Sequence, residues 1–399
     1  MSLRIGPGAM VAAAFIGPGT VTTATVAGAT SGISLLWAVA FSVMATLVLQ
    51  ELSVRTALAT QKDLATQARD FGHKRWWGPL LVILIVVAIG VGNAAYQSGN
   101  LSGAGIGLSA VLPVDFSFVV LLCAGVAATL ILLDRYRWLE RLLVVLVALM
   151  ALLFSGIAVL VAPLLLALPA ERLVPAFDTN NLSLALALVG TTVVPYNLFL
   201  HATAVRRRWA GTPVEEALAG ARTESMIAIL IGGGITFAIM VVAAALIPSA
   251  STIAALPALM AAIDNHFPGG GSFAVGLGLF AAGLTSAIAA PVAAGWAVCG
   301  ALGWSTEPGS RSFKGVALTV LLTGSFFAVV TTRPAALIVT AQVTNALLLP
   351  VIALILVALA NSKSLPEQLR NRTVTNVLAL LVLAIVLALA FTKLVSLIA

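Results

Sequence analysis

Eleven apolar segments, each close to the ~20 residues that a helix needs to cross a lipid bilayer, run through this chain with short polar loops between them. Lipid-exposed backbone must hydrogen-bond within its own helix or within a closed barrel, so such a series favours a bundle of spanning helices. Charged residues make up only 9% of the 399 residues, against about 25% in soluble domains. The expected spans are residues 8–30, 34–58, 79–104, 116–133, 142–168, 183–204, 223–247, 271–300, 315–332, 336–360 and 374–397. We therefore predict an all-α polytopic membrane protein with eleven transmembrane helices.

The basic residues are unevenly divided between the two sides of the predicted bundle. With eleven spans, only Arg172, Arg333 and Lys393 of the 21 Lys and Arg residues fall on one side, and all the others fall on the opposite side. The positive-inside rule then places the N-terminus in the cytoplasm and the C-terminus outside. We expect a bacterial-type inner membrane, with the net charge of +7 directed at anionic lipid rather than at nucleic acid.

Two of the expected spans contain helix breakers near the middle of the membrane. The first span carries Gly17, Pro18 and Gly19, and the sixth carries Pro195 directly after Val194. A proline removes a backbone donor and clashes with the carbonyl four residues earlier, and neighbouring glycines ease unwinding. The freed backbone groups must line a cavity or pack against protein. A kink with a purely structural role is the alternative interpretation of each break.

The positions of the two breaks predict an internal repeat. They fall in the first and sixth spans, so each opens a block of five spans, and the second block enters the membrane from the opposite side. Inverted repeats of this kind hold the substrate between their broken helices. We expect one membrane domain over residues 1–399, with repeat one at about 8–168, repeat two at about 183–360 and an extra helix at about 374–397.

At these breaks the chain resembles the NRAMP family of divalent-metal transporters. The first span reads GPGAMVAAAFIGPGTVTTATVAGATSGISLLWAV from Gly6 to Val39, and the sixth reads LVGTTVVPYNLFLHATAVRRR from Leu188 to Arg208. Weaker similarity runs through 280–300 and 341–350. The resemblance implies the LeuT-type 5+5 inverted-repeat fold, alternating access and metal ion transport.

The chain departs from the family pattern where the family binds its metal. By the resemblance, the metal-binding Asp falls on Gly17, the Asn on Thr20, the Met on Val194 and the following His on Tyr196. The positions that keep the pattern are Pro18, Gly19, Pro195, Asn197, His201 and Gln342, the last matching a tenth-span glutamine near the metal.

These departures remove the usual metal ligands from the predicted site. Transition metals favour carboxylate, imidazole or soft sulfur ligands, and Mg²⁺ sites usually supply one or two carboxylates. Of the 14 acidic residues, all but Glu51 fall in loops or near span ends, and Arg55 four residues after Glu51 offers it an ion pair. We therefore predict that the chain has no metal-binding residues and no cofactor.

The expected proton route is also altered. By the resemblance, the acids of the family's third span fall on Gln97 and Asn100, whose amides do not titrate. His201 is the one family position that could titrate near neutrality. These three residues are candidates for coupling, and a hydrogen-bonded structural role is the alternative for each.

The function predicted from these residues is NRAMP-like secondary transport by alternating access, without enzymatic activity. We expect the substrate to be neither Mn²⁺ nor Fe²⁺ but a neutral or zwitterionic small molecule. The alternatives are a divalent cation such as Mg²⁺ carried partly hydrated, or a non-transporting sensor. A monomer in the lipid bilayer is expected. The candidate substrate-binding residues are Gly17, Thr20, Thr191, Val194, Tyr196, Asn197 and Gln342, for which hydrogen bonding between helices is the alternative role.

Overall fold

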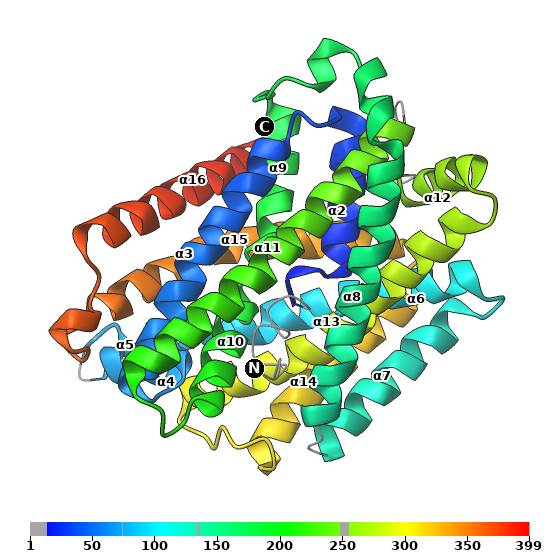
Figure 1. Ribbon diagram of the computed structural model, residues 1–399. Coiled ribbons are helices and arrows are strands. Elements are labelled where there is room, and N and C mark those ends of the chain that lie inside the picture. The colour runs from blue at the N-terminus through cyan, green and yellow to red at the C-terminus, as the bar shows by residue number, and fades with distance from the viewer. Residues whose placement is uncertain (1–13, 74, 134–135, 248–254, 399) are drawn as a thin grey trace.

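The computed structural model describes residues 14–73, 75–133, 136–247 and 255–398. These ranges are helical throughout, apart from short connections, and contain no strand. Ten of their helices are long and apolar enough to cross a membrane. The first predicted span lies partly outside the described residues, and its second half is helix α2 (Pro18–Ser31). The prediction of an all-α polytopic membrane fold is confirmed (Figure 1).

The spans follow one another with short connections. After α2, the spanning helices are α3 (Leu36–Thr60), the continuous α5, η1 and α6 (Gly78–Ile85, Val86–Val91 and Gly92–Val111), α7 (Phe116–Leu133), α8 (Tyr136–Val161), α9 and α10 (Thr179–Thr192 and Pro195–Arg208), α11 (Val214–Leu246), α13 (Gly270–Leu302), α14 (Arg311–Val330), α15 (Pro334–Ala360) and α16 (Thr373–Ile398). Shorter elements between them are α4 (Leu64–Gly72), η2 (Ala162–Ala167), η3 (Ala170–Arg172), α12 (Ala255–His266) and η4 (Glu367–Leu369).

Both predicted helix breaks are present. The chain leaves helical geometry at Gly17, whose backbone is extended, and α2 begins with Pro18. Val194 is likewise extended between α9 and α10, and α10 begins with Pro195. Proline at the first helical position removes a donor that would have no partner there and fixes φ for the helix. The two prolines therefore start new half-helices instead of bending continuous ones.

The centre of the bundle is built by close approach of α6 and α13, which lie against each other along much of their length. An added Cβ at Gly107 would lie 2.3 Å from the backbone nitrogen of Phe280, and one at Gly283 would lie 2.4 Å from that of Ala104. Only glycine permits this spacing of the two backbones. Helix α16 lies at the edge of the molecule against α15 (Figure 1).

Several helix ends differ from the predicted spans. Helix α11 begins at Val214, nine residues before the predicted start at 223. Helix α8 ends at Val161 instead of the predicted 168, and the 3₁₀ segment η2 follows it. The first turn of α11 contains Glu215 and Glu216, which stabilise a helix N-terminus electrostatically but are invisible to a search for apolar residues. The π-helix η1 and the short helices α4 and α12 had no counterpart in the sequence interpretation.

Candidate functional site

The two breaks meet through a pair of threonines. The hydroxyls of Thr20 and Thr191 lie 3.0 Å apart, although 171 positions separate them in the chain. The Thr20 hydroxyl donates to the backbone carbonyl of Phe15 at 2.8 Å, so the Thr191 hydroxyl is the donor between the two. The Phe15 carbonyl precedes the break, and its hydrogen bond to Thr20 meets the need for internal partners inside a membrane.

Gln342, from α15, packs against both broken helices. An added Cβ at Gly19 would lie 2.0 Å from the side-chain nitrogen of Gln342, and one at Gly190 would lie 2.5 Å from its backbone carbonyl oxygen. The Gln342 amide therefore covers the start of α2, while its backbone lies against the end of α9. The structure thus places Gln342 between Gly19 and the end of α9.

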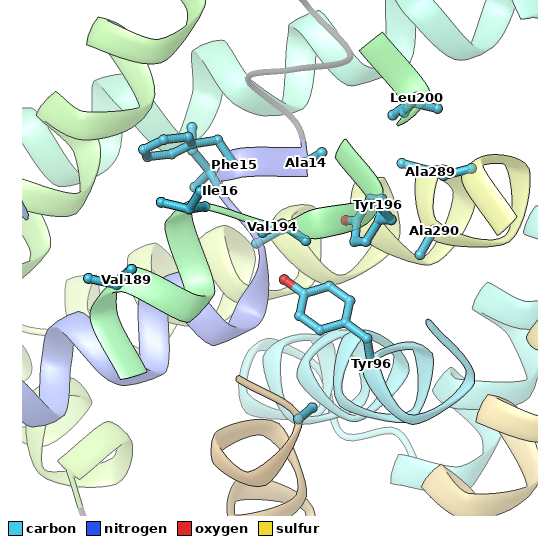
Figure 2. Packing of buried hydrophobic residues seen from close by; sticks show 14 of the residues in the cluster. Ala14, Phe15, Ile16, Tyr96, Val189, Val194, Tyr196, Leu200, Ala289 and Ala290 are labelled. Carbon is cyan, nitrogen blue, oxygen red and sulfur yellow. The ribbon is translucent and has the colours of Figure 1, made fainter. Parts of the chain in front are cut away.

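Two tyrosines cover the same region from the other side. The rings of Tyr96 on α6 and Tyr196 on α10 lie 5.4 Å apart between centroids at a tilt of 59°. Figure 2 shows the Tyr96 hydroxyl directed toward the break that contains Val194. An added Cβ at Gly17 would lie 3.1 Å from both the Tyr96 hydroxyl oxygen and the Ser286 hydroxyl oxygen. Hydroxyl groups thus border the position where the family resemblance places a carboxylate.

Tyr96 and Ser286 were absent from the predicted site. Tyr96 had a signal in the sequence, because it is a polar side chain at mid-span directly before Gln97. Ser286 had none, because a serine in a long apolar helix commonly bonds to its own backbone. Both are brought to Gly17 only by the packing of α6 and α13.

The remaining site candidates are enclosed at the start of α10. Val194, Tyr196 and Asn197 are each at most 2% exposed. The backbone N–H of Asn197 donates to the Val194 carbonyl at 3.1 Å, which closes the first turn after the break. Val194 and the tyrosine rings make one wall of the region apolar.

Glu51 is paired with two arginines. Glu51 on α3 pairs with Arg55 at 3.1 Å, as predicted, and also with Arg222 on α11 at 2.5 Å. Across the described ranges, no group of three or more His, Cys, Asp or Glu residues is placed to hold a metal ion. The described side chains at the breaks are hydroxyls, amides, aromatic rings and aliphatic groups.

Gln97 and Asn100 bond to a neighbouring helix and to each other. The Gln97 amide nitrogen donates to the Ala287 carbonyl on α13 at 2.9 Å. The Asn100 amide nitrogen donates to the Gln97 side-chain oxygen at 3.3 Å. These contacts correspond to the structural alternative stated for both residues.

His201 is fully buried on α10 between two other spans. Its Nδ1 lies 2.8 Å from the Gln50 side-chain oxygen on α3, and its Nε2 lies 3.4 Å from the Ser225 hydroxyl on α11. Ser225 also lines a pocket of ≈ 190 Å³ that contains Glu51 and Arg222. The imidazole is therefore one hydroxyl away from a cavity with two charged groups.

Comparison with known families agrees with the pattern at the breaks. A family model described as "Natural resistance-associated macrophage protein-like" matches residues 8–396. A divalent metal cation transporter MntH of Agrobacterium fabrum is 31% identical over 60% of this chain and 53% of its own length. Metal transporter Nramp2 of Populus trichocarpa is 30% identical over 78% of this chain and 60% of its own length. The chain thus spans little more than half the length of these relatives, whereas an MntH of Acidiphilium cryptum is 27% identical over 94% of this chain and 86% of its length.

Solved structures with the same fold include transporters of different substrates. A structure of the Eremococcus coleocola manganese transporter covers 98% of this chain and 85% of its own, with a TM-score of 0.78 and 22% identity. MhsT in complex with L-phenylalanine covers 99% of this chain and 98% of its own, with a TM-score of 0.66 and 16% identity. Both likenesses concern the fold, which is of the LeuT type.

Proposed function

Because the chain belongs to the natural resistance-associated macrophage protein-like family of membrane transporters, we propose that it carries a neutral or zwitterionic solute by alternating access between its two broken helices. The contact between Thr20 and Thr191 supports a site shared by two inverted repeats, at about 8–168 and 183–360. In such repeats the substrate lies where the unwound segments face each other.

The surroundings of Gly17 carry this proposal. A dehydrated dication at mid-membrane requires compensating negative charge, since burying an unpaired charge is very costly. Position 17 supplies no side chain, and the adjacent groups are the neutral hydroxyls of Tyr96 and Ser286. Val194 likewise replaces the sulfur ligand that the family resemblance predicts with an aliphatic group. The site is therefore suited to hydrogen bonding and not to binding a bare transition metal.

Several groups at the breaks could bind a polar solute. Thr20, Thr191 and the Gln342 amide offer donors and acceptors, and the tyrosine rings offer apolar surface. The half-helices α2 and α10 begin at the two breaks, so their positive dipole ends could attract a carboxylate. MhsT with L-phenylalanine is a precedent for a zwitterion in this fold.

A divalent cation is the second candidate, because the relatives MntH and Nramp2 are named metal transporters. Mg²⁺ holds its water tightly and is often bound through its waters. Hydroxyl and amide groups such as Thr20, Thr191 and Gln342 could accept hydrogen bonds from such waters. This candidate requires an ion that crosses the site without losing its inner shell.

Uptake into proteoliposomes distinguishes the two. We expect saturable uptake of a labelled amino acid or similar polar metabolite, with neither Mn²⁺ nor Mg²⁺ transported. Thr20→Val and Asn197→Ala should weaken uptake, whereas Thr129→Val, on the lipid-exposed face of α7, serves as the matched control. Saturable Mn²⁺ uptake would contradict the proposal, and saturable Mg²⁺ uptake sensitive to Thr20→Val would favour the second candidate.

We propose that transport is coupled to a proton, and that His201 binds and releases this proton. The support is its contact with Ser225 at 3.4 Å and the pocket that Ser225 shares with Glu51 and Arg222. The hydroxyl lies between the imidazole and this cavity, whose other walls are Leu47, Val54 and Met226, and could pass a proton between them. Gln97 and Asn100, with their amides committed to α13 and to each other, would support the route only by holding the helices in place.

A further inference from the structure

A groove of ≈ 620 Å³ lies on the outer face of the bundle, away from the breaks. It is bordered by η1 and the start of α6, by the end of α13 and by α14, which pack against one another. Its walls are mostly aliphatic and include Val86, Val91, Val298, Val316 and Val320. None of the candidate substrate residues lines it, so it is a separate site.

The dimensions of the groove match one leaflet of a membrane. Along α14 it extends from Arg311 to Thr323, which corresponds to about 18 Å at 1.5 Å per helical residue. Half of the bilayer's hydrocarbon core measures about 15 Å. One wall is the π-helix η1 (Val86–Val91), a distortion that is frequently found at functional sites.

The polar end of the groove carries a cation that no group of the described chain neutralises. Arg311 lines this end, and its side chain forms no hydrogen bond or ion pair within the described residues. Glu307, four residues earlier, is instead paired with Arg207 at 3.2 Å. Trp304 lies at the same end and is 53% exposed, as is typical of tryptophans at the boundary between lipid and water.

Helix stability does not explain the position of Arg311. It is the first residue of α14, whose N-cap is already provided by Ser310 accepting from the Phe313 backbone at 3.2 Å. A positive charge in the first turn of a helix is unfavourable because it meets the positive end of the helix dipole. A ligand with negative charge would remove that cost.

We propose that this groove binds an anionic phospholipid, with one acyl chain between η1, α13 and α14 and its phosphate beside Arg311. The leaflet is the one that the basic loops face, where anionic lipid is attracted by Lys and Arg. Trp304, which also lines the polar end, offers its indole N–H to the headgroup and its ester oxygens.

Two glycines that face open space allow a matched test. An added Cβ meets nothing within 4 Å at either Gly315 or Gly125. Gly315 lines the groove, whereas Gly125 is exposed on α7 outside it. Gly315→Phe should fill the groove without strain, and Gly125→Phe should add the same bulk elsewhere on the lipid-facing surface.

The measurement is native mass spectrometry of the purified protein with equal amounts of phosphatidylglycerol and phosphatidylcholine. We expect the wild type and Gly125→Phe to retain one more tightly bound phosphatidylglycerol than Gly315→Phe. Arg311→Gln should lower the preference for phosphatidylglycerol over phosphatidylcholine by about fivefold, the contribution of one basic residue near an anionic surface. Equal phosphatidylglycerol binding by Gly315→Phe and the wild type would overturn the site, and an unchanged preference in Arg311→Gln would overturn the role of the headgroup.

Discussion

The side-chain amide of Gln97 donates a hydrogen bond of 2.9 Å to the backbone carbonyl of Ala287. Ala287 precedes Pro291 by four residues inside α13, so it has lost the backbone N–H that would normally bond to it. A side chain of α6 thus supplies the donor that a proline removes from α13. Asn100 holds the Gln97 amide in turn through its oxygen.

This relationship predicts a coupled effect on stability. Gln97→Leu leaves the Ala287 carbonyl buried without its donor, which should cost about 1–3 kcal/mol. Pro291→Ala restores a backbone donor, so Gln97→Leu should cost much less in that background. Thermal unfolding of the four detergent-purified proteins measures this interaction. Additive losses would show that the carbonyl does not depend on Gln97.

The fold could be predicted largely because each feature depended on local chemistry. The helix breaks at Gly17 and Val194 coincide with the prolines that begin α2 and α10, whereas Pro291 and Pro350 lie inside continuous helices. The Glu51–Arg55 pair follows from helical spacing. The partner of Gln97 could not be predicted in this way. Its hydrogen bond depends on a proline almost 200 positions away, which only the packing of α6 on α13 brings near.

A second prediction concerns Gly19 and Gln342. In Gly19→Ala the new Cβ would lie 2.0 Å from the Gln342 amide nitrogen, so the amide must leave the break. Gly19→Ala and Gln342→Ala should therefore each weaken the apparent affinity for the transported solute by up to about tenfold, the worth of one neutral hydrogen bond. The apparent affinity of the double variant should be no lower than that of the single variant with the lower affinity.

Uptake at varied solute concentration gives these affinities. Gly234→Ala, at a position of α11 where an added Cβ meets nothing within 4 Å, is the control for adding a methyl group. Losses that multiply in the double variant would mean that Gly19 and Gln342 act separately, and the amide would then have no place in the site.

The third prediction concerns His201. An inward-directed proton gradient should accelerate uptake by the wild type but not by His201→Asn, because the amide takes the place of Nδ1 beside Gln50 without titrating. Uptake across a range of external pH, with and without the gradient, measures this. His266→Asn, on the exposed end of α12, should behave like the wild type. Retained stimulation in His201→Asn would leave His201 with a structural role alone.

The fourth prediction concerns Arg172, which bridges the ends of two spans. Its guanidinium donates to the carbonyls of Gly28 and Ala29 at 2.9 Å each and approaches that of Ile247 at 3.5 Å. These carbonyls end α2 and α11, where a cation is also favoured by the helix dipoles. Hydrogen bonds to charged groups contribute about 1.5–3 kcal/mol. Arg172→Ala should therefore raise the population of molecules in which the ends of α2 and α11 are separated by about tenfold to a hundredfold.

Labelling with a membrane-impermeant maleimide reports this opening. The reporter is Ala29→Cys, at a fully buried position, in a background that carries Cys123→Ala and Cys299→Ala. Arg333→Ala removes a charge that the sequence places on the same side of the membrane, so it controls for charge alone. Equal labelling rates with and without Arg172 would show that this contact does not hold the end closed.

The candidate site was less predictable than the fold. Thr20 and Thr191 could be proposed from the sequence because polar residues beside a helix break are rare inside a membrane, and Gln342 could be proposed from the family resemblance. The hydroxyls of Tyr96 and Ser286 that border Gly17 come from spans without a break. They lie beside the position where a longer side chain at residue 17 would extend. Because Gly17 has no side chain, its sequence motif does not indicate which residues lie next to it.

The fifth prediction rebuilds the missing ligands. Gly17→Asp with Val194→Met restores the carboxylate and thioether that the family resemblance assigns to these positions, and a Cβ at position 17 would lie 3.1 Å from the hydroxyls of Tyr96 and Ser286, which must yield slightly. A charged partner in a buried site is worth about 3–5 kcal/mol, so Mn²⁺ should bind more than a hundredfold tighter than to the wild type in calorimetry. Gly17→Asn with Val194→Met has the same shape without the charge and should not bind. If the wild type bound Mn²⁺ as tightly as the rebuilt protein, the carboxylate would not be what decides the substrate, and a neutral or zwitterionic solute would lose its main support.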